Sequence, residues 1–201
     1  MPFTADDVEI LERSTPFQGY FRIDRYHLRH RTHDGGWTAP MSREIFERGH
    51  AVGILLYDPR QDRVGLIEQF RPGALAAGWH PWLIEVVAGI IDDGETPEAV
   101  AVRECREEAG IAVGRLEPIC RYLVSPGGST ESMELFCAEV NADQLSGLHG
   151  LPDEGEDIRV LTLPRHEAMA WLQEGRIANS MTIIALQWLA LNHDSLLDKW
   201  K

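Results

Sequence analysis

The chain has 201 residues and a formal net charge of −13, from 19 basic and 32 acidic side chains. Such an acidic balance repels nucleic-acid backbones and anionic membranes, so neither is expected as the main partner. The length suffices for one full hydrophobic core and a small additional module.

The first residues, the longest apolar run and the cysteines give an expectation about the cellular location of the protein. The opening stretch, MPFTADDVEILE, is acidic and polar, which argues against a signal peptide. The longest apolar run, 181–191, is too short to span a bilayer. Cys105, Cys120 and Cys137 form no CxxC pair and lie among apolar neighbours, so we expect three reduced core cysteines and a cytoplasmic protein.

Residues 1–49 predict a β-rich module. A short strand is expected at 8–11, a longer alternating strand at 20–31 and a return strand at 41–48, with a hairpin turn signal at 34–36. Three strands without a helix cannot bury much apolar surface. The module must therefore pack on the rest of the chain or on a second copy.

Residues 50–201 alternate between strand and helix patterns. Strands are expected at 52–57, 64–70, 83–88, 116–124, 133–140 and 158–163, and helices at 97–109, 165–173 and 178–192. An irregular loop at 72–82 and a long polar loop at 141–157 separate some of them. Strands interspersed with helices predict an α/β fold, with a mixed sheet between helical layers.

The helix at 97–109 carries Glu104, Glu107 and Glu108, and Glu95 stands just before it. At about 100° per residue, we expect its apolar residues to be buried and these glutamates to face the opposite side. Like charges four residues apart repel by a few tenths of a kcal/mol. Their oxygens suit Mg²⁺, which takes one or two carboxylates and leaves room for substrate phosphates. The alternative interpretation is a solvated charged face.

The order of residues from Gly89 to Ile111 separates these alternatives. It matches the Nudix box at every fixed position, with Cys105 as a mild departure where a larger aliphatic residue is usual. The matching residues include Gly89, Glu95, Arg103, Glu104, Glu107, Glu108 and Gly110. On this motif the chain is identified as a member of the Nudix superfamily.

Beyond the box, the chain resembles the bacterial ADP-ribose pyrophosphatase group of this superfamily. The matching stretches are 43–51, 66–71, 81–91, 125–128, 149–160 and 184–191, and a Pro-Gly dipeptide follows Gly110 by 16 residues. The resemblance implies an α/β/α sandwich at 50–201 and an N-terminal three-stranded antiparallel module at 1–49 that is exchanged across a homodimer. It also implies Mg²⁺-dependent hydrolysis of the diphosphate bond of ADP-ribose to AMP and ribose 5-phosphate.

The resemblance assigns metal ligands and structural residues of the box. Glu104, Glu108, Glu156 and the backbone carbonyl of Ala88 would hold two or three Mg²⁺ ions, for which Mn²⁺ is a candidate substitute. Glu107 would be a weaker ligand or an outer partner. Structural roles in the motif are implied for Gly89, Glu95, Arg103, Glu107 and Gly110, with Glu95 orienting Arg103.

The acidic loop at 153–157 is the best place for a general base, because acids among glycines have the reach of a lid. The resemblance implies, by position, that Glu154 is the base and Glu156 a further metal-shell acid. The sequence leaves open which neighbouring acid faces the attacking water. A solvated acidic turn is the alternative.

Substrate contacts are expected mostly from the resemblance. Arg71 would pair with the diphosphate, although a surface ion pair is equally compatible with its place at a strand end. Tyr20 would stack on adenine, or else be a core aromatic. Arg43 and Glu44 would reach a neighbouring subunit's ligand, and Glu131 would bind ribose hydroxyls.

Two other functions stay open at this point. One is a Nudix hydrolase of another nucleoside diphosphate sugar, such as GDP-mannose. The other is a catalytically silent module that binds ADP-ribose, against which the complete set of box acids argues.

Overall fold

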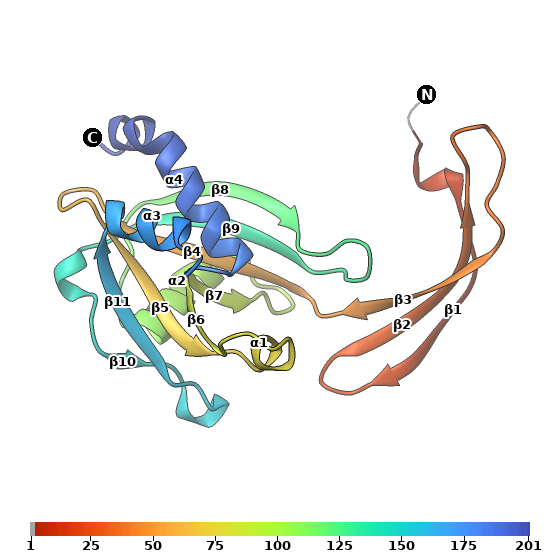
Figure 1. The fold of residues 1–201 in the computed structure, drawn as a ribbon, viewed down its shortest axis with the longest axis horizontal. Helices are drawn as coiled ribbons and strands as arrows, with labels where there is room; N and C mark the ends of the chain where they lie inside the picture. Colours follow the sequence, from red (N-terminus) through yellow and green to blue (C-terminus); the bar gives the residue numbers. More distant parts are fainter. Residues whose placement is uncertain (1–2) are drawn as a thin grey trace. The chain divides into compact units, whose positions relative to one another are not determined.

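The computed structural model describes residues 3–201, apart from the side chain of Glu154 (Figure 1). The chain divides into two compact units. The first contains the chain up to His50 together with Leu123–Ser132, and the second contains Ala51–Tyr122 and Met133–Lys201.

The first unit is built on an antiparallel sheet in the order β1-β2-β3. Its strands are β1 (Val8–Gln18), β2 (Arg22–His30) and β3 (Met41–Glu47), and the short 3₁₀ helix η1 (Ala5–Asp7) precedes them. The strand predicted at 8–11 is much longer in the structure. The sequence pattern does not show its full length, because the register shifts twice along β1 and interrupts the simple alternation of side chains.

A hairpin tip from later in the chain joins this sheet. The backbone N–H of Phe46 donates to the carbonyl oxygen of Gly128 at 2.8 Å, and the N–H of Thr130 donates to that of Phe46 at 3.2 Å. The Thr130 hydroxyl donates to Glu47 at 2.8 Å. Leu123–Ser132 is thus bound to the end of β3.

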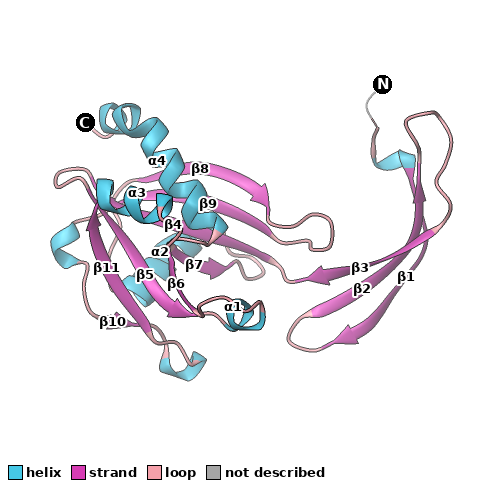
Figure 2. Ribbon diagram, in the orientation of Figure 1, coloured by secondary structure: helices cyan, strands magenta, loops and turns pink. Residues whose placement is uncertain are grey.

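The second unit contains most of a larger, mixed sheet of eight strands (Figure 2). Six strands follow the order β10-β11-β5-β4-β9-β8, while β6 pairs with β5 and β7 with β4. The strands are β4 (His50–Asp58), β5 (Arg63–Phe70), β6 (Trp82–Glu85), β7 (Val87–Ile90), β8 (Leu116–Leu123), β9 (Ser132–Glu139), β10 (Leu148–His149) and β11 (Ile158–Pro164).

Helices cover both faces of this sheet. Successive residues of β4 point to opposite faces, so Ile54 and Leu56 pack with α2 (Pro97–Ala109), whereas Leu55 packs with α3 (Arg165–Gln173) and α4 (Ser180–Lys199). The predicted α/β/α sandwich is confirmed.

Other local expectations also differ from the structure, and the single strand expected at 83–88 is divided into β6 and β7. α4 continues past the predicted end at 192, because Leu196 is buried and extends its apolar face. The short helix α1 (Pro72–Ala76) lies in the loop expected to be irregular. Cys105 and Cys137 are buried as expected, but Cys120 is exposed, because it lies on the outward side of β8.

The long polar loop contains further short elements. The 3₁₀ helices η2 (Ala142–Gln144) and η3 (Pro152–Glu154) lie on either side of β10. Among the described residues, no helix is long and apolar enough to cross a membrane.

Candidate active site

Helix α2 has the bounds that the sequence predicts, because local signals set both ends. The Thr96 hydroxyl accepts a hydrogen bond from the N–H of Ala99 at 3.3 Å, and Pro97 occupies the first helical turn. At the other end Gly110 is left-handed, with φ 64°, and its N–H donates to the carbonyl oxygen of Arg106.

The glutamates of α2 do not share one solvated face. Glu104 is 8% exposed and Glu108 is 3% exposed, so the expectation that they lie opposite the buried side is wrong. Seven residues span about two turns, which places Glu108 only about 20° from the buried Ala101 around the axis. Glu107 is half-buried. Two carboxylates therefore enter the interior together with the apolar face.

Strand β7 makes room for these carboxylates. A Cβ built on Gly89 would lie 1.8 Å from Oε1 of Glu104, so any other residue at this position would have to displace the buried carboxylate. The backbone N–H of Ala88 donates to Oε2 of Glu108 at 2.9 Å. Strand β7 and helix α2 are therefore in contact through the side chains of Glu104 and Glu108.

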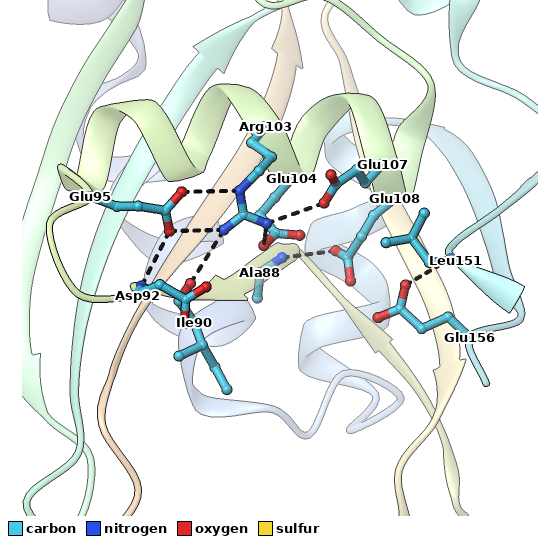
Figure 3. A network of polar contacts seen from close by, with 10 residues as sticks. All are labelled: Ala88, Ile90, Asp92, Glu95, Arg103, Glu104, Glu107, Glu108, Leu151 and Glu156. Atoms are coloured by element: carbon cyan, nitrogen blue, oxygen red, sulfur yellow. Dashed lines mark hydrogen bonds and ion pairs between the residues drawn. The ribbon is translucent and has the colours of Figure 1, made fainter. Parts of the chain in front are cut away.

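Arg103 connects the remaining acids of the motif (Figure 3). Its Nη2 donates to Glu95 at 3.1 Å, and its Nη1 donates to Glu104 at 2.8 Å and to Glu107 at 3.2 Å. The hydrogen bond with Arg103 holds the pKa of Glu95 below its usual value. Glu95 also accepts from the N–H of Asp92, so the pair ties the loop before α2 to the helix.

Burial raises the pKa of both interior carboxylates. It raises the pKa of Glu104 to about 7, with help from the charges of Glu107 and Glu156 and against the effect of Arg103. Burial also raises the pKa of Glu108 to about 8, against the effects of the Ala88 N–H and Arg71. Arg103 and Arg71 thus offset only part of the effect of burial on these two carboxylates.

The acidic loop is anchored to the end of α2. The N–H of Gly150 donates to the carbonyl oxygen of Glu107 at 3.1 Å, and the His149 ring occupies the space beside Gly110 that a Cβ would fill. Glu156 accepts from the N–H of Leu151 at 3.0 Å, and its charge acts on both buried glutamates. Glu156 thus lies near them, whereas the predicted base, Glu154, has its side chain outside the described residues.

Arg71 has a partner that the sequence interpretation missed. Its Nε donates to Oε2 of Glu85 at 2.7 Å, and Glu85 is 1% exposed. The effect of Arg71 on Glu108 places the guanidinium near the glutamates of α2. A signal for Glu85 was available, since it is the one acid inside the apolar run 83–88.

The other expected substrate residues lie in the first unit. Tyr20 is 88% exposed, which rules out the core-aromatic alternative. Arg43 donates to the carbonyl oxygen of Ser42, and Glu44 pairs with Arg25 at 2.9 Å.

Glu131 is buried and forms an ion pair with Arg48. Arg48 was not singled out from the sequence. Its partner lies 83 residues away along the chain, so no local pattern could pair them.

The donor set of the second unit fits a hard dication. Glu104, Glu108 and Glu156 offer oxygen ligands, and two of them are buried with too little compensating charge. Among the described side chains, no group of three His, Cys, Asp or Glu is already arranged around an ion. Arg103 engages Glu104 and the Ala88 N–H engages Glu108, so a cation would compete with both contacts.

The raised pKa values predict how stability depends on pH. In the folded, metal-free protein Glu104 and Glu108 keep protons to about pH 7 and about pH 8, whereas an unfolded glutamate loses its proton near pH ~4.3. The folded state then binds more protons, so the free energy of unfolding falls as pH rises from about 5 to about 8.

Thermal unfolding in EDTA measures this effect. We expect Tm to be roughly 5 °C lower at pH 8 than at pH 5.5, from a loss of about 2 kcal/mol. The double variant Glu104→Gln/Glu108→Gln should lose most of this difference. A Tm that rises over the same interval in the parent protein, and not in the variant, would contradict the burial of charge at these two positions.

Comparison with known proteins agrees with the motif. The sequence model of the NUDIX domain matches residues 47–181. The chain is 48% identical to the ADP-ribose pyrophosphatase of Escherichia coli (strain K12) over 198 residues, which is 98% of this chain and 95% of the relative. It is 42% identical to that of Haemophilus influenzae over 205 residues, covering 99% and 93%. The chain belongs to the Nudix family.

More distant similarities broaden the comparison. The GDP-mannose pyrophosphatase of Yersinia pestis is 36% identical over 177 residues, covering 87% of each chain. A solved structure described as an ADP compounds hydrolase superposes with a TM-score of 0.76 at 20% identity, covering 97% of this chain and 98% of the other. At that identity the structural match supports the fold alone.

Proposed function

We propose that the protein is a metal-dependent hydrolase that cleaves the diphosphate bond of ADP-ribose to AMP and ribose 5-phosphate. The observation that carries the proposal is the pair of buried carboxylates, Glu104 and Glu108, held against Ala88 and Gly89 within a complete Nudix box. The names of the relatives at 48% and 42% identity support ADP-ribose as the substrate.

The metal ligands of the proposal are Glu104, Glu108, Glu156 and the backbone carbonyl of Ala88. Two or three Mg²⁺ ions would neutralise the diphosphate and lower the pKa of a bound water, and Mn²⁺ is a candidate substitute. Arg103 donates hydrogen bonds to both Glu104 and Glu95, and so connects the helix to the loop that precedes it. The burial of Glu104 and Glu108, whose charge Arg103 and Arg71 offset only in part, supports this assignment.

Glu154 is proposed as the general base that takes a proton from the attacking water. It lies in η3, in a loop that is anchored on α2 through Gly150 and closed on itself by the hydrogen bond from Leu151 to Glu156. Glu154→Gln should lower kcat by about 10²-fold or more with little change in KM. Asp153→Asn, one residue away on the exposed loop, is the matched control. Equal loss in both variants would point to loop disruption, and no loss in Glu154→Gln would remove it as the base.

The substrate contacts of the proposal are Arg71, Tyr20, Arg43, Glu44 and Glu131. Arg71 would pair with the diphosphate through its Nη groups, since Nε is engaged by Glu85. Tyr20 offers an exposed ring for adenine. Arg43 and Glu44 would reach a neighbouring subunit's ligand, and Glu131 would bind ribose hydroxyls alongside or in place of Arg48.

A homodimer with exchanged N-terminal modules is part of the proposal. Among the described residues, both clusters of buried apolar side chains lie in the second unit, while β1 leaves large apolar residues exposed. These residues are Val8, Ile10, Leu11 and Phe17. Light scattering of the full chain should give twice the monomer mass, and a monomer at micromolar concentration would contradict the exchange.

A cytoplasmic location is the last element of the proposal. Its support is the set of three free thiols, of which Cys120 is exposed. A disulfide involving Cys120 in protein isolated under thiol-blocking conditions would contradict it.

A panel of nucleoside diphosphate sugars tests the choice of substrate. We expect kcat/KM for ADP-ribose to exceed that for GDP-mannose by about tenfold or more. GDP-mannose is the second candidate because of the Yersinia relatives. Faster turnover of GDP-mannose would replace the proposed substrate, and binding of ADP-ribose without turnover would favour a silent binding module.

A further inference from the structure

Glu85 is a buried carboxylate outside the Nudix box that links β6 to the end of β5 and to the start of α4. Glu85, at the end of β6, accepts from Arg71 at 2.7 Å, from Gln69 at 3.3 Å and from Nδ2 of Asn179 at 2.6 Å. It is 1% exposed. An anion this deep needs such partners, since burying it without them is costly.

Stability alone is a weak reason for such an arrangement. Replacing a buried ion pair by apolar residues is often neutral or stabilising, so a buried pair is weak evidence for a stabilising role. Arg71 follows β5, and its own backbone N–H is held by the carbonyl oxygen of Pro81 at 2.7 Å. The backbone of this arginine is therefore fixed just before β6, at Pro81, and its side chain at the end of β6, at Glu85.

The segment after Glu85 continues directly to the candidate metal site. The N–H of Val86 donates to the hydroxyl of Thr182 at 2.9 Å, and the N–H of Ala88 donates to Glu108. The four residues from Glu85 to Ala88 thus contact Arg71 at one end and Glu108 of α2 at the other.

We infer that Glu85 is a positioning residue, which fixes the Arg71 guanidinium beside the carboxylates of α2 where it meets the substrate diphosphate. The inference rests on the proposed function. A free arginine loses side-chain rotamer entropy when it is immobilised. Anchoring Nε beforehand leaves the two Nη groups for an end-on pair with a phosphate and removes part of this cost.

Asn179 provides a matched control. Its Oδ1 caps α4 by accepting from the N–H groups of Met181 and Thr182, while its Nδ2 donates to Glu85. Asn179→Ser keeps a capping oxygen and removes the donor to Glu85. This variant perturbs Glu85 without touching Arg71, so it should leave diphosphate binding unchanged within about twofold.

The test is a double-mutant cycle on Glu85→Gln and Arg71→Ala. Two quantities are measured with Mg²⁺, namely KM for ADP-ribose and Kd for ADP by calorimetry. Glu85→Gln should raise both about tenfold with kcat nearly unchanged, and it should add nothing in the Arg71→Ala background. Glu85→Asp, which keeps the charge, should recover part of the loss and replaces the Gln variant in the cycle if that variant does not fold.

The possible results separate the inference from the proposed function. Additive effects in the cycle, or unchanged Kd in Glu85→Gln, would overturn the positioning role. Parent protein that binds ADP but does not hydrolyse ADP-ribose would contradict the proposed function alone, since the cycle on Kd still decides the role of Glu85. If parent protein hydrolyses ADP-ribose but binds no ADP, the cycle is decided on KM, and additive effects there would overturn the positioning role.

Discussion

Glu108→Gln is expected to lower kcat for ADP-ribose by about 100-fold or more. Loss of an outer partner of a metal ligand already costs about 10- to 100-fold, and Glu108 is proposed as a direct ligand. The amide keeps the shape and still accepts the N–H of Ala88, so the fold should be preserved. Steady-state rates at saturating Mg²⁺ measure the effect.

The same variant makes a second, opposite prediction for stability. Glu108 is 3% exposed, and burial raises its pKa to about 8. Removing the ionisable group should therefore raise Tm in EDTA at high pH while activity falls. Glu98→Gln, on the exposed first turn of α2, is the control and should change neither quantity. Full turnover in Glu108→Gln would contradict the metal assignment.

Gly89→Ala is expected to disrupt the site through a single methyl group. That group would lie 1.8 Å from Oε1 and 2.1 Å from Cδ of Glu104, so the helix or the carboxylate has to move. Overpacking of this kind costs about 1–3 kcal/mol. Because Glu104 also binds Arg103, its displacement should lower kcat as well as the free energy of unfolding.

Gly73→Ala is the matched control for this prediction. Gly73 lies in α1, and a Cβ there meets nothing within 4 Å. The change should be neutral or slightly stabilising, by up to about 1 kcal/mol, because alanine favours the helix. Both variants are measured by denaturation and by steady-state assay. If Gly89→Ala kept wild-type activity and a wild-type Tm, the close approach of β7 and α2 would be contradicted.

Much of the fold follows from local signals that the sequence carries. The bounds of α2 were predicted correctly because Thr96, Pro97 and Gly110 act within one turn of the helix. The strands of the sandwich core follow from their apolar runs. β1 was underestimated because its register shifts and its many polar residues hide the alternation.

The candidate site was predictable only in part. The motif identifies the acids, but the burial of Glu104 depends on how closely Gly89 approaches α2, which is a property of the packed fold. The partner of Arg71 is Glu85, which is brought to it by the pairing of β5 with β6. Such contacts arise from strand register, and no spacing rule within one element predicts them.

Product analysis with and without metal tests the proposed reaction most directly. Purified protein is incubated with ADP-ribose in Mg²⁺ or in EDTA, and the products are separated and quantified. We predict equal amounts of AMP and ribose 5-phosphate with Mg²⁺ and about 100-fold less of both in EDTA. Products at an undiminished rate in EDTA, or cleavage at a bond other than the diphosphate, would contradict the account.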